Sequence, residues 1–120
     1  MYLGLDLGTS GLKGVVIDAG QHVVAEAQAP LTVSRPAPGW SEQAPADWIA
    51  AAEAVLDALA GELDLAQVQG IGLSGQMHGA TLLDASDTVL RPCILWNDTR
   101  AHVEAAEMDA EPAWREISGN

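Results

Sequence analysis

The chain has few basic residues, a single cysteine and no long hydrophobic run. Its 120 residues include 5 lysines and arginines against 17 aspartates and glutamates, which gives a formal net charge of −12. This acidic balance argues against nucleic acid and anionic membrane surfaces as partners. Cys93 is the only cysteine, so an internal disulfide is excluded and a reducing compartment is favoured. No apolar stretch approaches the roughly 18 residues of a membrane span.

The amino terminus also lacks the marks of an export signal. No basic segment precedes the first apolar run, and Asp6 interrupts that run. Hydrophobic residues make up 48% of the chain, which at this length suffices for one small domain with a core. We therefore expect a cytoplasmic globular protein that binds neither nucleic acid nor membrane.

Residues 4–13 are the most informative stretch. Asp6 lies within the apolar run 3–7, the glycine-rich link 8–11 follows, and a second apolar run covers 12–17. Two such runs joined by a short glycine-rich link predict a β-hairpin. Burial of an ionised carboxylate is costly unless a cation or hydrogen-bond donors pair with it. We therefore expect Asp6 to project from the end of its strand toward a site.

This hairpin carries groups of the kind that suit the triphosphate end of ATP. Two glycines let backbone N–H groups converge, while two hydroxyls and the only lysine add donors and a cation. These residues are Gly8, Thr9, Ser10, Gly11 and Lys13. Asp6 beside them could hold hydrated Mg²⁺. The alternative is a tight hairpin without a ligand, because Gly-Ser turns are common. The glycine spacing fits neither a Walker A loop nor the dinucleotide fingerprint.

Three further elements are expected to complete a sheet with a helix on one face. A third strand over 23–31 would make an antiparallel meander with the hairpin. A helix over 45–60 is predicted, with Pro45 in its first turn and Gly61 after its end. Its helical periodicity places four residues in the core: Trp48, Ala52, Val55 and Leu59. The apolar run 68–74 predicts a strand that is buried on both faces and joins the sheet in parallel.

The segment 75–79 begins where that last strand ends. Ligands in α/β sheets gather at the carboxyl ends of strands, so His78, which lies between Gly75 and Gly79 at a strand end, is a candidate binding residue. The alternative is a structural histidine. Met77 beside it could equally fill a gap under the loop. A short hairpin is expected around 84–87.

The last informative segment precedes an expected helix over 99–109. Asn97 or Asp98 could cap this helix. Arg100 would lie in its first turn, where the helix dipole opposes a cation, which indicates another role such as holding a carboxylate. A further helical turn is expected over 112–117. Trp40, outside the periodic pattern of the first helix, is interpreted as a structural plug of its loop.

Four segments, taken in order, resemble the amino-terminal part of the FGGY family of carbohydrate kinases: 6–13, 39–43, 74–79 and 94–100. The resemblance implies an α/β fold of the ribonuclease H-like type found in the actin-like ATPase and hexokinase superfamily, with a mixed sheet, a three-stranded meander and helices. It also implies that residues 1–120 are the amino-terminal part of a first kinase domain. The rest of that domain, the second domain, the catalytic base and the adenosine motif would lie beyond residue 120.

The resemblance further implies transfer of the γ-phosphoryl group of ATP, with Mg²⁺, to a sugar hydroxyl. D-xylulose is the expected sugar, with ribulose, glycerol or gluconate as alternatives, and a non-catalytic module of the same half-fold is the alternative outside enzymes. The phosphate-binding positions would be Gly8, Thr9, Ser10, Gly11 and Lys13, with Asp6 as the catalytic carboxylate near Mg²⁺. The sugar-binding positions would be Met77, His78, Trp96, Asn97 and Asp98. We expect a homodimer, or self-association of the chain taken alone, and no sugar phosphorylation by that chain alone.

Overall fold

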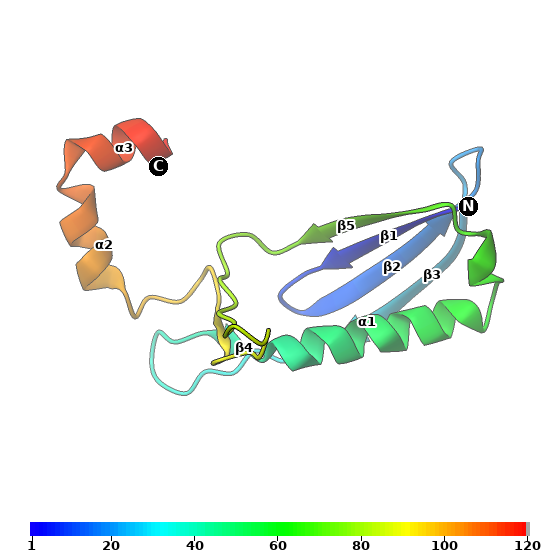
Figure 1. The fold of residues 1–120 in the computed structure, drawn as a ribbon, viewed down its shortest axis with the longest axis horizontal. Coiled ribbons are helices and arrows are strands. Elements are labelled where there is room, and N and C mark those ends of the chain that lie inside the picture. Colours follow the sequence, from blue (N-terminus) through cyan, green and yellow to red (C-terminus); the bar gives the residue numbers. More distant parts are fainter. Residues whose placement is uncertain (120) are drawn as a thin grey trace.

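The computed structural model describes residues 1–119 as a mixed sheet with helices (Figure 1). The main sheet has strand order β3-β2-β1-β5, and β1 is antiparallel to β2 but parallel to β5. The α/β class, the antiparallel meander and the parallel fourth strand are as the sequence predicts. In chain order the elements are β1 (Tyr2–Leu7), β2 (Gly11–Ile17), β3 (Val23–Pro30), β4 (Glu42–Gln43), α1 (Pro45–Ala60), the 3₁₀ turn η1 (Leu65–Gln67), β5 (Gly70–Gly75), β6 (Cys93–Ile94), α2 (His102–Asp109) and α3 (Pro112–Ser118).

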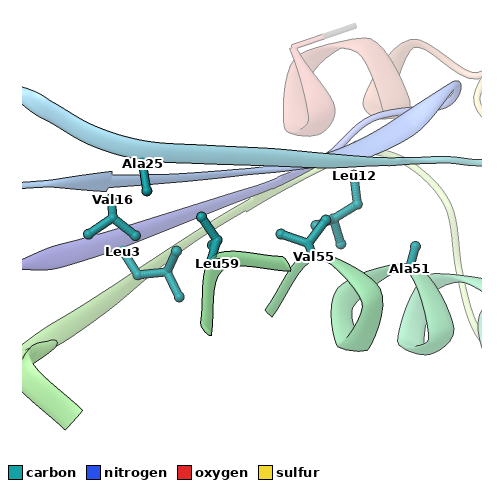
Figure 2. Packing of buried hydrophobic residues seen from close by; sticks show 7 residues of the cluster. All are labelled: Leu3, Leu12, Val16, Ala25, Ala51, Val55 and Leu59. Atoms are coloured by element: carbon teal, nitrogen blue, oxygen red, sulfur yellow. The ribbon is translucent and has the colours of Figure 1, made fainter. Parts of the chain in front are cut away.

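The core lies between α1 and one face of the sheet (Figure 2). Alternate residues of β2 point at the helix, and full burial of each such Leu or Val contributes about 1.5–3 kcal/mol. The buried side chains of this core cluster are Leu3, Leu12, Val16, Ala25, Ala51, Val55 and Leu59. Gly14 allows this contact, because a Cβ there would lie 2.5 Å from Cγ1 of Val55. The lack of a side chain at Gly14 therefore allows α1 to pack closely against β2.

Helix α1 has the predicted limits. Pro45 occupies its first turn, and the N–H of Gly61 closes its end by donating to the carbonyls of Asp57 and Ala58. The predicted core position of Trp48 is wrong. Its ring is only partly buried and lies outside the core cluster, because its indole N–H points sideways to Gln43 at 3.1 Å.

Strand β5 is not buried on both faces, contrary to prediction. Ile71 is 63% exposed and Leu73 is 80% exposed, because β5 is an edge strand and α1 packs over β2 and β3 instead. An uncovered apolar edge strand is a surface on which chains associate. Self-association of the chain stays a prediction.

A second, two-stranded sheet pairs β4 with β6, and the sequence did not predict it. Each strand is two residues long, so no alternation marks it. The short hairpin expected around 84–87 is present, with a bridge between Leu83 and Val89. Asp84 holds that turn by accepting hydrogen bonds from the N–H groups of Ser86 and Thr88, which lower the pKa of its carboxyl.

Helices α2 and α3 stand away from the sheet at the end of an extended segment, so the chain measures 53 × 32 × 30 Å (Figure 1). Helix α2 begins at His102, three residues later than expected, and neither Asn97 nor Asp98 caps it. The turn over 112–117 forms as α3. Within residues 1–119, none of the helices has the length and apolar character needed to traverse a bilayer.

Candidate functional site

The tip of the β1–β2 hairpin forms an open turn. The N–H of Gly8 donates to the carbonyl of Gly11 at 2.9 Å, and within residues 1–119 no acceptor engages the N–H groups of Thr9 and Ser10. Neither glycine has a positive φ, so the reason for Gly11 is space: a Cβ there would lie 2.8 Å from the carbonyl oxygen of Ala29. Free N–H groups on a narrow turn can bind an anion.

Asp6 and Lys13 lie opposite each other in the β1–β2 ladder, on the sheet face away from α1. Asp6 is exposed and, among the described residues, forms no ion pair, so its carboxylate is open at the end of β1 as expected. Lys13 is paired: its Nζ lies 2.9 Å from Oε2 of Glu26 on β3. The turn and these strands line an open hollow of about 510 Å³ that includes Asp6, Ser10 and Lys13.

Three distant segments meet at the hairpin tip. The N–H of Gln76 donates to the carbonyl of Leu7 at 2.9 Å, which anchors the end of β5 beside the turn. The Thr9 hydroxyl lies 3.3 Å from Oε1 of Gln76, and the indole N–H of Trp96 donates to the Thr9 oxygen at 3.4 Å. The structure therefore brings the predicted phosphate turn and the predicted sugar segments to one place.

Met77 and His78 lie on the exposed loop that follows Gln76. Met77 is 72% exposed, and His78 adopts a φ of +65°, a conformation uncommon outside glycine. Strained backbone of this kind concentrates at functional sites. The next residue, Gly79, lies close to β6, where an added Cβ would approach the Cys93 sulfur to 3.0 Å. The loop is thus clamped between the hairpin tip and β6.

The Asp98 side chain is buried and hydrogen-bonded within the protein. Its side chain is 2% exposed, and one carboxylate oxygen accepts from Nη2 of Arg100 at 2.7 Å and from the N–H of Ser41 at 2.6 Å. Hydrogen bonds from Arg100 hold the pKa of the Asp98 carboxyl well below its usual value, and the same contact raises the pKa of Arg100. Arg100 also approaches Glu42 to 3.7 Å. The expectation that Arg100 holds a carboxylate is confirmed, although Arg100 precedes α2 and does not lie in its first turn as predicted.

Trp40 completes that cluster. The Arg100 guanidinium lies 3.7 Å from the centre of the Trp40 ring, a cation–π contact. Gly39 has a φ of +79°, and a Cβ there would clash with the Thr99 hydroxyl. These contacts tie the loop before β4 to the loop after β6, which agrees with the interpretation of Trp40 as a structural residue.

Asn97 and Trp96, next to this cluster, differ in how accessible they are to a ligand. Oδ1 of Asn97 is buried with no hydrogen-bond partner in the described part of the chain, whereas Trp96 is 62% exposed. Of the predicted sugar-binding positions, Met77, His78 and Trp96 are open to a ligand. Asp98 is not, because Arg100 and Ser41 occupy its carboxylate.

The carboxylates suit only a weakly held metal ion. Among residues 1–119, no three His, Cys, Asp or Glu side chains gather as a metal site. A single carboxylate such as Asp6, next to a turn with free N–H groups, suits a Mg²⁺ ion that keeps most of its waters and is held mainly by phosphates.

Sequence reasoning missed two residues of the site, Gln43 and Gln76. Gln43 is 2% exposed and bonds to the hairpin tip, to α1 and to Gln76. Both lie within the segments that carry the resemblance, but nothing in their local pattern indicates burial. The only available signals were that Gln76 follows the predicted strand 68–74 and that Gln43 precedes the predicted helix 45–60.

Comparisons with known proteins agree with this geometry. Residues 1–119 match the model of the N-terminal domain of the FGGY family of carbohydrate kinases. The chain is 50% identical to the xylulose kinase of Escherichia coli over 121 aligned positions, covering 100% of this chain and 25% of that protein.

Two solved structures resemble the chain along nearly all its length. The crystal structure of a "xyloylose kinase" from Brucella ovis has a TM-score of 0.94 at 62% identity and covers 99% of this chain and 26% of its own. The xylulose kinase from Rhodospirillum rubrum has a TM-score of 0.86 at 38% identity, covering 91% of this chain and 23% of its own. These neighbours have the actin-like ATPase fold that the resemblance implied. The chain spans about a quarter of the length of the curated relatives it matches.

Proposed function

This chain belongs to the FGGY family of carbohydrate kinases, and we propose that the protein of which it forms part transfers the γ-phosphoryl group of ATP to the 5-hydroxyl of D-xylulose. In this proposal, residues 1–120 are the amino-terminal part of the first kinase domain. The names of the relatives at 50% identity favour xylulose over ribulose, glycerol or gluconate.

One observation carries the proposal: the open turn at Thr9 is hydrogen-bonded to Gln76, the residue directly before Met77 and His78. A phosphate-binding turn and a loop with an exposed imidazole are therefore adjacent. Phosphoryl transfer depends mainly on positioning and on charge stabilisation, which this adjacency supplies.

At the phosphate end, each group has a distinct role. The N–H groups of Thr9 and Ser10 and the Ser10 hydroxyl donate to phosphate oxygens, and Lys13 neutralises charge after leaving Glu26. Asp6 is the residue that would hold hydrated Mg²⁺. When bound, Mg²⁺ supplies charge neutralisation at the phosphate oxygens.

At the sugar end, the loop offers hydrogen-bonding groups over an apolar floor. The imidazole of His78 bonds sugar hydroxyls, while Met77 and Trp96 pack on the carbon face. Asp98 contributes by fixing this loop through Arg100. The general base lies outside residues 1–120 by family resemblance, so these residues alone would not phosphorylate the sugar.

The test uses the whole protein. ADP release is followed in a coupled assay with D-xylulose, D-ribulose, glycerol and gluconate, and the product is identified by mass and NMR. A kcat/KM for D-xylulose at least about tenfold above the others supports the proposal, since one or two sugar hydroxyls discriminate by that much. Preference for another substrate reassigns the sugar, and ATP binding without phosphoryl transfer to any of the four would favour a non-catalytic module.

A further inference from the structure

Gln43 is the centre of a buried hydrogen-bond network. Its Nε2 donates to the carbonyls of Thr9 at 2.8 Å and Thr32 at 3.4 Å. Its Oε1 accepts from the indole N–H of Trp48 at 3.1 Å and from Nε2 of Gln76 at 3.0 Å. A carboxamide has two hydrogens to donate and two lone pairs, so every hydrogen-bonding position of this side chain is used.

The partners fix the direction of each hydrogen bond. An indole N–H can only donate and a backbone carbonyl can only accept, so the Gln43 amide has one orientation that satisfies both. Gln76 must then donate to Gln43, which leaves Oε1 of Gln76 facing the Thr9 hydroxyl at 3.3 Å. The hydrogen of that hydroxyl is therefore given to Gln76.

This direction limits what the Thr9 side chain can do. Its oxygen already accepts from the Trp96 indole at 3.4 Å, so only one lone pair remains free. A phosphate oxygen is also an acceptor and cannot bond to that lone pair. The Thr9 hydroxyl is thus engaged with the loop, while its backbone N–H remains available to an anion.

We propose that Gln43 and Gln76 are positioning residues that commit the Thr9 hydroxyl to the loop at 76–78, and so couple the phosphate turn to the sugar loop. The inference rests on the proposed function, because it assigns roles within the same site. It changes the role of the Thr9 hydroxyl from a phosphate donor to a link, and makes Ser10 the hydroxyl that meets phosphate.

The experiment compares four variants of the whole protein: Thr9→Val, Thr9→Ser, Gln76→Met and the double variant Thr9→Val with Gln76→Met. Valine matches threonine in shape without the hydroxyl, and serine retains it. Gln69→Met, at an exposed glutamine just before β5, is the matched control. Kd values for ATP are measured calorimetrically with and without D-xylulose, alongside KM and kcat.

We expect Thr9→Val and Gln76→Met each to raise the KM for D-xylulose roughly tenfold, with Kd for ATP alone within about twofold of wild type. The double variant should resemble either single variant, because both remove the same link. Thr9→Ser should restore the wild-type KM. The effect of D-xylulose on ATP affinity should shrink in Thr9→Val and in Gln76→Met. It should persist in Gln69→Met.

Two kinetic or binding outcomes and one spectroscopic outcome would overturn the inference. One is a rise in Kd for ATP in Thr9→Val with no change in KM for the sugar, which would make the hydroxyl a phosphate donor. The other is additive effects in the double variant. Failure of the proposed function is distinguishable, because wild-type protein would then not phosphorylate D-xylulose. The NMR resonance of the Trp48 indole N–H, assigned with Trp48→Phe, should shift in Gln76→Met, because Trp48 and Gln76 donate to the same oxygen of Gln43. An unchanged resonance would refute the network itself.

Discussion

The ammonium nitrogen of Lys13 on β2 lies 2.9 Å from Oε2 of Glu26 on β3. Both side chains are more than half exposed, and such pairs contribute only about 0.2–1 kcal/mol. The pair is therefore weak enough for a phosphate to displace Glu26. It holds Lys13 on the sheet face that carries Asp6.

Replacement of Glu26 by glutamine should strengthen ATP binding in the whole protein. Lys13 would no longer have to leave a carboxylate, so the KM for ATP should fall about two- to threefold with kcat unchanged. The difference should fade in high salt, which screens exposed charges. Steady-state kinetics at two ionic strengths measure both effects, and an increase in KM would show that Glu26 helps to orient Lys13 for the phosphates.

Asp6→Asn should remove most kinase activity and leave the fold intact. An amide has nearly the shape of the carboxylate but loses the charge that organises Mg²⁺ and phosphates, and we expect kcat to fall by about 10²-fold or more. Because Asp6 is exposed, the melting temperature should change little. Asp57→Asn, at an exposed carboxylate on α1, should have no effect on either quantity. Near-normal turnover in Asp6→Asn would remove this residue from the site.

His78 allows side-chain chemistry to be separated from backbone strain. His78→Ala and His78→Gly both remove the imidazole, and each should weaken sugar binding by about 1–3 kcal/mol. Only glycine relieves the φ of +65°, so His78→Gly should unfold at a higher temperature than His78→Ala. Calorimetric titration with D-xylulose and thermal melts provide the two measurements. An equal loss of ATP affinity would indicate that His78 supports the loop without touching the sugar.

Gly14→Ala should destabilise the chain by about 1–3 kcal/mol, because the new methyl group would press on α1. The contact concerned is the 2.5 Å approach to Cγ1 of Val55. Gly72→Ala is the matched control: it lies in β5 of the same sheet, and no atom lies within 4 Å of the position of its added methyl group. Urea unfolding curves measure both, and equal midpoints would contradict the packing described for α1.

Stability at acidic pH should depend on Asp98. Its pKa is lower in the folded chain than the ordinary value of 3.8, so the pair with Arg100 stabilises the fold above that pH. That contribution is lost as the pH falls through the folded-state pKa. Asp98→Asn should therefore be less stable than wild type at pH 6, with the gap narrowing toward pH 2. Thermal melts across this range measure it, and a constant gap would mean that the pair does not titrate as described.

The sequence predicts well the elements whose signals are local. Pro45 and Gly61 mark the ends of α1, and the glycine-rich link marks the hairpin, because turn and cap chemistry acts within a few residues. The exposure of Leu73 could not be predicted in this way, since it depends on which strands α1 covers. The pairing of Gln43 with Gln76 was equally inaccessible, because it joins segments more than thirty residues apart.

Asp98 illustrates how a correct local inference can mislead about a site. The sequence indicates that Arg100 holds a carboxylate, and the structure agrees. That same contact withdraws the carboxylate that the resemblance assigned to the sugar. The two expectations concerned one pair of side chains, and only three-dimensional geometry shows that they compete.

The position of β1 between β2 and β5 has a consequence for the nascent chain. β2 follows β1 within a few residues, whereas β5 is made about 60 residues later. At a synthesis rate of about 5–20 residues per second, the edge of β1 that pairs with β5 therefore remains unpaired for several seconds on the ribosome. An unpaired strand edge is a template for pairing with another chain. Neighbouring ribosomes on one messenger would thus expose the same vulnerable edge together, and a pause in translation before residue 70 would lengthen that exposure.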